Sequence, residues 1–118
     1  MIVAIPVDEN QTDVCVSFGR APYVLFHHTE TGETEVKKNP AAAEEGGAGI
    51  KSAQFIVDQG THALITIRCG ENAAEVLRAA DITIYKAEGD LASENLAAIQ
   101  EGKLSLLTSF HAGFLGKQ

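Results

Sequence analysis

The chain has few basic residues and no long apolar run, and each shortage excludes a class of protein. Nine lysines and arginines stand against sixteen aspartates and glutamates, so the formal net charge is −7. A nucleic-acid-binding surface would be basic, and we therefore expect no nucleic-acid partner. Crossing a bilayer takes roughly 20 consecutive apolar residues. No run in this chain approaches that length, so we expect no association with a membrane.

Cysteine is also scarce, with two residues in 118. The N-terminal "MIVAIPV" lacks the basic residues of a signal peptide and is too short for one, so we expect a cytoplasmic protein. In that compartment Cys15 and Cys69 would be reduced thiols, available as metal ligands. Hydrophobic residues make up 45% of the chain, which is enough for one globular domain with a single core.

What the chain does contain is a clear change of apolar period. Before Pro40, apolar residues repeat about every two positions, which is typical of strands. After Pro40 they repeat about every 3.6 positions, which is typical of helices. The resulting order, βββαβαβα, predicts a single α/β domain in which helices flank a five-stranded mixed sheet. The expected elements are strands 2–7, 23–28 and 34–39, helix 50–59, strand 63–67, helix 72–80, strand 82–85 and helix 91–101.

Helix faces and helix starts also follow from the pattern. Ile50 and Ile56 are predicted on the buried face of the first helix. Asn72 with Glu75 three residues later predicts a capping box, and Asp90 predicts the cap of the last helix.

The end of the chain has no clear period. We expect the domain to cover residues 1–107 and residues 108–118 to form a mobile C-terminal tail. His111 lies in this tail. An idle tail is the favoured interpretation, and the alternative is that His111 folds back as a ligand.

The stretch "EEGGAGIKS", residues 44–52, resembles a phosphate-binding loop without being one. The nucleotide P-loop places Gly directly before Lys, whereas Ile50 precedes Lys51 here. The segment before the glycines also reads as a loop rather than a strand. We therefore expect no bound nucleotide, although backbone N–H groups at a glycine-rich helix start suit another anion.

Three loops are predicted to meet beyond the carboxyl ends of the strands, where open α/β sheets bind ligands. They contain "CVSFGR", "GGAG" and "RCGEN". Their candidate cofactor-binding residues are Ser17, Arg20, Gly46, Gly47, Gly49, Arg68 and Gly70.

The cysteines are the candidate metal ligands of this region. Cys69 lies between a strand and a helix start, where the helix dipole and Arg68 would lower its pKa. An ordinary buried side chain is an equally supported reading of Cys69. For Cys15 that apolar reading is the favoured one, and ligation is the weaker alternative.

Arg20 and Arg68 are candidate anion-binding groups, because guanidinium forks pair well with the oxygens of anionic ligands. An equal alternative is that they form salt bridges with nearby carboxylates, at Asp8, Asp13 or Glu71.

Five short segments resemble, in the same order, the dinitrogenase iron–molybdenum cofactor biosynthesis family. This family comprises small carriers of metal–sulfur cofactors and includes the molybdenum–copper orange proteins. The resemblance covers roughly residues 1–107 and implies a ribonuclease H-like fold. The segments are "IPVDEN", "SFGRAPY", "GGAGI", "CGENAAEVLRAADITIY" and "EGKL".

Two positions depart from the family pattern. The family carries H-F-G-R where this chain has Ser17 in place of His, which removes a natural cluster ligand. It often carries G-P-N-A where this chain has Gly-Glu-Asn-Ala from Gly70 onward.

The resemblance implies a noncatalytic carrier or scaffold for an iron–molybdenum or molybdenum–copper sulfur cofactor, with a cofactor-donor or acceptor protein as partner. The alternative is an interaction or regulatory module on the same fold that binds no cofactor. Ser17 favours the module, whereas Cys69 and the arginines favour the carrier. A nuclease is disfavoured, because metal-dependent nucleases gather several carboxylates and only Asp8 ends a core strand.

Overall fold

The described part of the chain, residues 1–44 and 46–111 of a computed structural model, contains five strands and three helices. Their order is the predicted βββαβαβα, so the α/β class is confirmed. The elements are β1 (Ile2–Val7), β2 (Tyr23–His28), β3 (Thr34–Lys38), α1 (Ala48–Asp58), β4 (Ala63–Thr66), α2 (Glu71–Ala79), β5 (Thr83–Lys86) and α3 (Ala92–Gln100).

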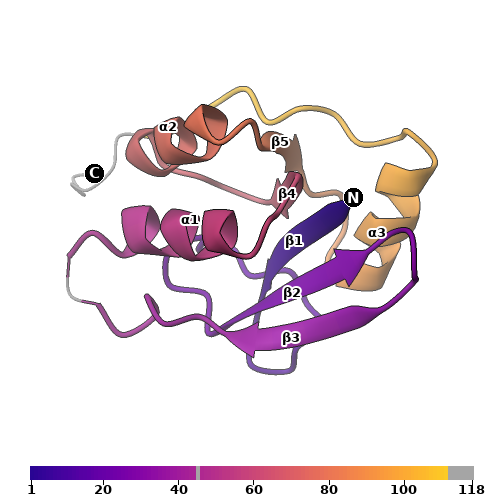
Figure 1. Ribbon diagram of the computed structural model, residues 1–118, viewed down its shortest axis with the longest axis horizontal. Helices are drawn as coiled ribbons and strands as arrows, with labels where there is room; N and C mark the ends of the chain where they lie inside the picture. The colour runs from indigo at the N-terminus through magenta and orange to yellow at the C-terminus, as the bar shows by residue number, and fades with distance from the viewer. Residues whose placement is uncertain (45, 112–118) are drawn as a thin grey trace.

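The strands form one mixed sheet in the order β3-β2-β1-β4-β5 (Figure 1). β1 pairs antiparallel with β2 and parallel with β4. The outer pairs continue these directions, since β2 and β3 are antiparallel while β4 and β5 are parallel. Because β1 and β4 run the same way, their carboxyl ends lie at the same edge of the sheet.

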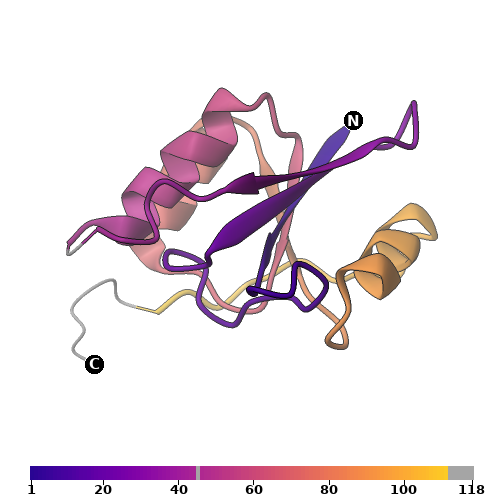
Figure 2. The same cartoon turned by 90° about the horizontal axis from the view of Figure 1, so that it is seen from below.

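Helices cover both faces of the sheet, with α1 and α2 on one face and α3 on the other (Figure 2). The alternation of β1 side chains explains this arrangement. Ala4 packs in a buried cluster with Ile56 of α1 and Leu77 of α2. Its neighbour Val3 packs in a second cluster with Ala92 of α3. The two faces of β1 therefore pack into two separate apolar clusters, one on each side of the sheet.

The buried face of α1 is set by residues four apart, Ala48, Ser52 and Ile56. The prediction that Ile50 shares this face is wrong, since 44% of Ile50 is exposed. The helix begins two residues before Ile50, and its inward stripe runs through the small residues of its first turns. Ile50 is left at the rim of the molecule.

Neither α2 nor α3 begins with a side-chain cap hydrogen bond. The predicted capping box of Asn72 and Glu75 is wrong, because α2 already begins at Glu71 and Asn72 lies inside its first turn. The predicted cap at Asp90 is also wrong, since Leu91 occupies the N-cap position of α3.

After α3 the chain returns across the molecule as an extended segment, Ser105–His111, which we call the strap (Figure 1). Backbone hydrogen bonds at Ser105 and Leu107, of 2.8 and 3.0 Å, join the strap to β5. Further on, the guanidinium carbon of Arg78 lies 4.5 Å from the centre of the Phe110 ring. The strap is therefore fastened first to the sheet and then to α2.

The predicted domain boundary at residue 107 falls inside the strap. Of the predicted tail 108–118, residues 112–118 lie outside the described residues. The boundary and the mobile tail therefore stay predictions. Within the part of the chain that the structure describes, no helix has both the length and the apolar character to cross a membrane.

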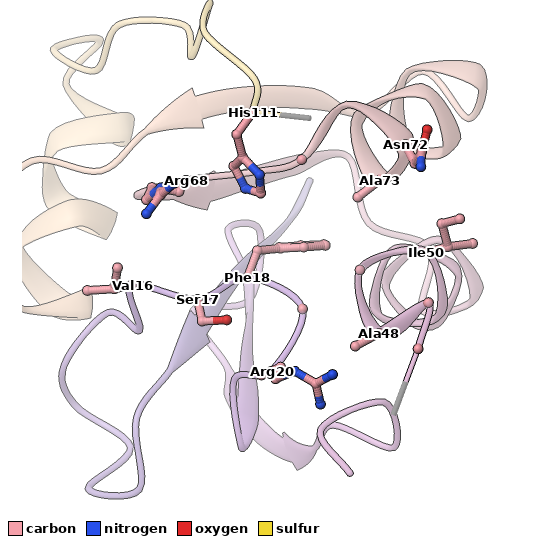
Figure 3. A pocket seen from close by; sticks show the side chains of 15 residues that line it. Val16, Ser17, Phe18, Arg20, Ala48, Ile50, Arg68, Asn72, Ala73 and His111 are labelled. Atoms are coloured by element: carbon pink, nitrogen blue, oxygen red, sulfur yellow. The ribbon is translucent and has the colours of Figure 1, made fainter. Parts of the chain in front are cut away.

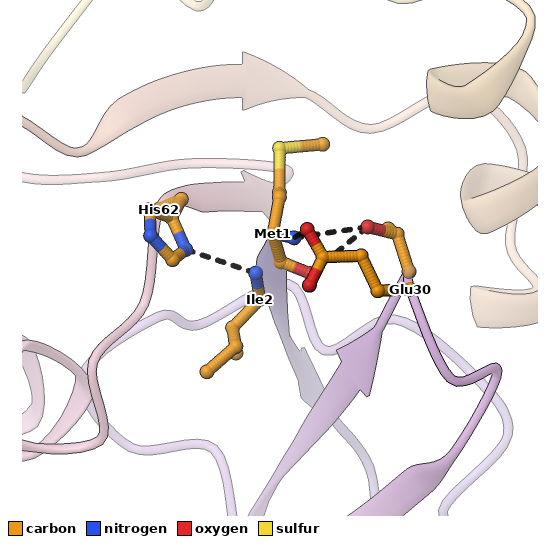
Figure 4. Close-up of polar contacts among 5 residues, drawn as sticks. Met1, Ile2, Glu30 and His62 are labelled. Carbon is orange, nitrogen blue, oxygen red and sulfur yellow. Dashed lines mark hydrogen bonds and ion pairs between the residues drawn. The ribbon is translucent and has the colours of Figure 1, made fainter.

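The opposite end of the sheet is closed by the first residues of the chain (Figure 4). The Ile2 backbone N–H donates to Nδ1 of His62 at 2.9 Å. The N-terminal ammonium lies 3.4 Å from the carboxylate of Glu30. His62 thus has a structural role at the start of β1, away from the strand ends where a ligand is expected.

Candidate functional site

Four segments distant in sequence surround one cavity at the carboxyl ends of β1 and β4 (Figure 3). Its volume of about 700 Å³ is in the range of small-molecule sites. We call this cavity the site cleft. All seven residues that the sequence predicts as cofactor-binding line it. The lining consists of Val16, Ser17, Phe18, Gly19, Arg20, Gly46, Gly47, Ala48, Gly49, Ile50, Arg68, Gly70, Asn72, Ala73 and His111.

The start of α1 forms one wall of the site cleft. Gly47 is its N-cap, with φ of 70°, a left-handed conformation that glycine adopts without strain. It supplies no side-chain cap. The first N–H groups of any α-helix lack intrahelical partners and carry the positive end of the helix dipole. This wall therefore suits an anion.

The loop after β1 lies directly on this helix start, and the contact depends on Gly19. A Cβ atom on Gly19 would stand 2.8 Å from the backbone nitrogen of Gly49, closer than side-chain atoms come. Gly19 was not predicted from the sequence as a site residue. The contact joins the first and second walls of the site cleft.

A buried polar network holds the same loop in place. The Asn39 side-chain amide donates to the backbone oxygen of Ala21 at 3.0 Å and to the Ser52 hydroxyl at 3.2 Å. The Ser52 hydroxyl in turn donates to the backbone oxygen of Phe18 at 3.5 Å. Sequence reasoning missed both polar residues, because Asn39 reads as the end of a strand and Ser52 as a polar position of a surface helix.

The start of α2 and the strap form the third wall. Gly70 is the N-cap of α2, and the Glu71 N–H donates to the backbone oxygen of His111 at 2.8 Å. The backbone at His111 therefore folds back onto α2, while a role of His111 as a ligand stays a prediction. The imidazole of His111 projects from the strap into the site cleft (Figure 3).

The arginines approach the site cleft from opposite sides, Arg20 from one and Arg68 beside His111 from the other (Figure 3). Nη1 of Arg20 donates to the backbone oxygen of Glu44. Arg68 is exposed, and within residues 1–44 and 46–111 it forms no ion pair. Within the described residues, then, Arg68 does not form the salt bridge to a nearby carboxylate that was its alternative role.

The cysteines lie outside the lining of the site cleft. Cys69 is 1% exposed and belongs to the apolar cluster under α1 and α2. Its expected low pKa is wrong, because burial raises the pKa to about 12 and the opposing charge comes from Arg78 rather than Arg68. Burial also raises the pKa of Cys15, and Asp8 raises it further. Metal ligation by either thiol stays a prediction that would require the side chain to move.

Among the residues that the structure describes, no three His, Cys, Asp or Glu side chains gather as a metal site. The lining offers guanidinium groups, helix N–H groups, the Ser17 hydroxyl and the His111 imidazole. Such donors suit a preassembled anion that brings its own ligands, rather than a bare metal ion.

Comparison with known proteins gives a consistent family. A sequence model of the family described as dinitrogenase iron-molybdenum cofactor matches residues 1–102. An uncharacterized protein of Methanocaldococcus jannaschii is 32% identical over 107 residues, which cover 88% of this chain and 89% of the relative.

Solved structures share the fold. The apo form of the orange protein from Desulfovibrio gigas superposes with a TM-score of 0.84 at 25% identity, covering 92% of this chain and 93% of the other. A Thermotoga protein named for NifB and placed in the DUF35 family has a TM-score of 0.79 at 37% identity, covering 95% and 97%. The ribonuclease H-like label remains what the sequence resemblance implies.

Proposed function

The chain belongs to the dinitrogenase iron–molybdenum cofactor family, and from this premise we propose that it is a noncatalytic carrier or scaffold for an anionic metal–sulfur cofactor. The cofactor, of the iron–molybdenum or molybdenum–copper type, is cargo held in the site cleft. The apo orange protein among its structural neighbours supports the choice of cofactor class.

The observation that carries the proposal is local positive character within an acidic chain. The net charge is −7, yet Arg20 and Arg68 both line the site cleft, together with the N-terminal ends of α1 and α2. Each helix end contributes about 0.3–1 kcal/mol toward an anion when exposed. A hydrogen bond to a charged group contributes about 1.5–3 kcal/mol. The arginines therefore supply the larger part of the attraction.

The donor set determines how the cargo would be held. With the thiols outside the lining, the cofactor keeps its own sulfide ligands and receives hydrogen bonds and charge from the protein. The proposed role of Cys69 as a metal ligand requires more, since a thiol with a pKa of about 12 must leave the core and lose its proton. The variant Cys69→Ser separates these two modes of binding.

The test is anaerobic reconstitution of the protein with thiomolybdate plus copper, or with an iron–sulfur cofactor precursor, followed by desalting and metal analysis. Wild type should retain metal and show a visible absorption band. Arg20→Ala and Arg68→Ala should each lower retention by about tenfold, equivalent to roughly 1.4 kcal/mol. Cys69→Ser lowers retention sharply only if that thiol is a ligand.

Two controls make the experiment specific. Lys103→Ala removes the same charge just beyond the end of α3, on the other face of the sheet and outside the lining, and should leave retention unchanged. Labelled ATP with Mg²⁺ should not be retained, because Lys51 already lies 3.2 Å from the carboxylate of Glu44. If wild type retains no metal at all, the interaction or regulatory module without a cofactor becomes the better reading.

A further inference from the structure

We propose that His111, delivered by the strap, is a direct metal ligand for the cargo in the site cleft. This inference rests on the proposed function and deepens it, because it names a coordinating atom where the rest of the lining offers only hydrogen bonds and charge. It concerns the imidazole, whose ring projects into the site cleft beside Arg68 (Figure 3).

The first support is the position of His111 relative to the other candidate ligands. Among the described lining residues it is the one histidine, and neither cysteine lines the cavity. Imidazole is a good ligand for copper and iron, whereas the guanidinium and hydroxyl groups of the cavity are not.

The second support is the way in which the backbone places this residue. The backbone oxygen of His111 accepts the Glu71 N–H at 2.8 Å, so the main chain is fixed at the first turn of α2. One residue earlier, Phe110 packs against the apolar core and under Arg78. Anchoring at Phe110 and at the His111 carbonyl limits the freedom of the imidazole, and a pre-positioned ligand binds at a lower entropic cost.

The third support is that coordination by one imidazole fits the cargo chemistry. A thiomolybdate unit is already saturated with sulfide, but a copper or iron ion joined to it can accept one further ligand. One protein ligand therefore suffices for this cargo, consistent with the lack of any cluster of three metal-binding side chains among the described residues.

The experiment compares two probes, thiomolybdate alone and thiomolybdate with copper(I), on wild type and His111→Ala. Alanine keeps the backbone oxygen that accepts the Glu71 N–H, so the strap remains anchored. Loss of a ligand should lower retention of the copper-containing probe by at least about tenfold. Retention of thiomolybdate alone should stay within about twofold, because sulfide-saturated molybdenum does not bind the imidazole.

X-ray absorption at the copper edge provides a structural readout. A nitrogen scatterer should be present in loaded wild type and absent in loaded His111→Ala. Ser109→Ala, an exposed change in the same strap, is the matched control and should behave as wild type.

Three results would overturn the inference, and they differ in what else they affect. If His111→Ala retains the copper probe as well as wild type does, His111 is not a ligand while the carrier function stands. If Phe110→Ala lowers retention and His111→Ala does not, the strap acts by closing the cavity rather than by coordination. If wild type retains neither probe, both this inference and the proposed function fail.

Discussion

Gly19 and Gly49 meet at the edge of the site cleft, where the loop after β1 lies on the first turn of α1. The backbone atoms approach so closely that a single methyl group would not fit between them. Gly47, two residues earlier, adopts φ of 70° and turns the chain into the helix. At the scale of residues, then, the cavity is shaped by the absence of side chains as much as by the charges around it.

The substitution Gly19→Ala should lower the free energy of unfolding by about 1–3 kcal/mol, because the new Cβ would overlap the Gly49 nitrogen and force the loop from the helix. Gly46→Ala is the control, since nothing lies within 4 Å of its Cβ position. Urea unfolding of the two variants measures the difference. Equal stability of Gly19→Ala and Gly46→Ala would contradict the close contact.

The Cys69 thiol predicts a pH dependence of stability. Burial raises its pKa from 9.0 to about 12, so folding favours the protonated form. The stabilisation is complete below about pH 9 and is lost as the pH rises toward 12. The free energy of unfolding of wild type relative to Cys69→Ala should therefore decline between pH 8 and roughly pH 11. Other titrating groups are common to both proteins, and a constant difference across this range would refute the prediction.

At the scale of elements, the site is made by two helix starts, the loop after β1 and the strap. α1 and α2 lie side by side on the same face of the sheet, with Ala73 of α2 within 3.7 Å of the Cβ position of Gly49 (Figure 1). Their N-terminal ends therefore open on the same cavity. The strap completes the site by capping α2 with a backbone oxygen, where the sequence predicts a capping box of Asn72 and Glu75.

Removing the ring in Phe110→Ala should loosen the strap. A cation–π contact of this kind contributes roughly 0.5–2 kcal/mol, and the buried ring contributes further. Hydrogen exchange at the Glu71 amide should become several times faster, because its acceptor is held less firmly. Limited proteolysis near the predicted boundary at residue 107 should also quicken, leaving a folded core. An exchange rate equal to that of Ser109→Ala would mean that Phe110 does not anchor the strap.

At the scale of the whole molecule, the charge of the site cleft differs in sign from the net charge of the chain: Arg20 and Arg68 line the cleft, whereas the chain as a whole is acidic. The net charge of −7 repels nucleic acid and nucleotides, and Glu44 lies beside Lys51 in the glycine-rich segment. The positive groups that remain near the site cleft are concentrated where helix dipoles reinforce them. For the proposed carrier, positive groups gathered at the site cleft within an acidic chain would favour a compact anion over a longer polyanion.

The sequence by itself determined the order of elements, the mixed sheet and the segments that build the site. These features depend on local rules, namely the change of period at Pro40, the short apolar strands and the direction of α/β crossovers. Strand ends that point the same way must place their loops together, so Ser17, Arg20 and Arg68 could be assigned to the same edge from the chain alone.

Only the tertiary structure decided how deeply each side chain lies and what replaces the expected caps. Burial of Cys69 depends on α1 and α2 packing above it, and packing from distant segments leaves no local pattern in the sequence. The same holds for the contact of Gly19 with Gly49 and for the network of Asn39 with Ser52. The strap is the clearest case. Its residues have no helical or strand period, and they are held by hydrogen bonds to β5 and α2, which are distant in sequence from most of the strap and leave no local pattern in it.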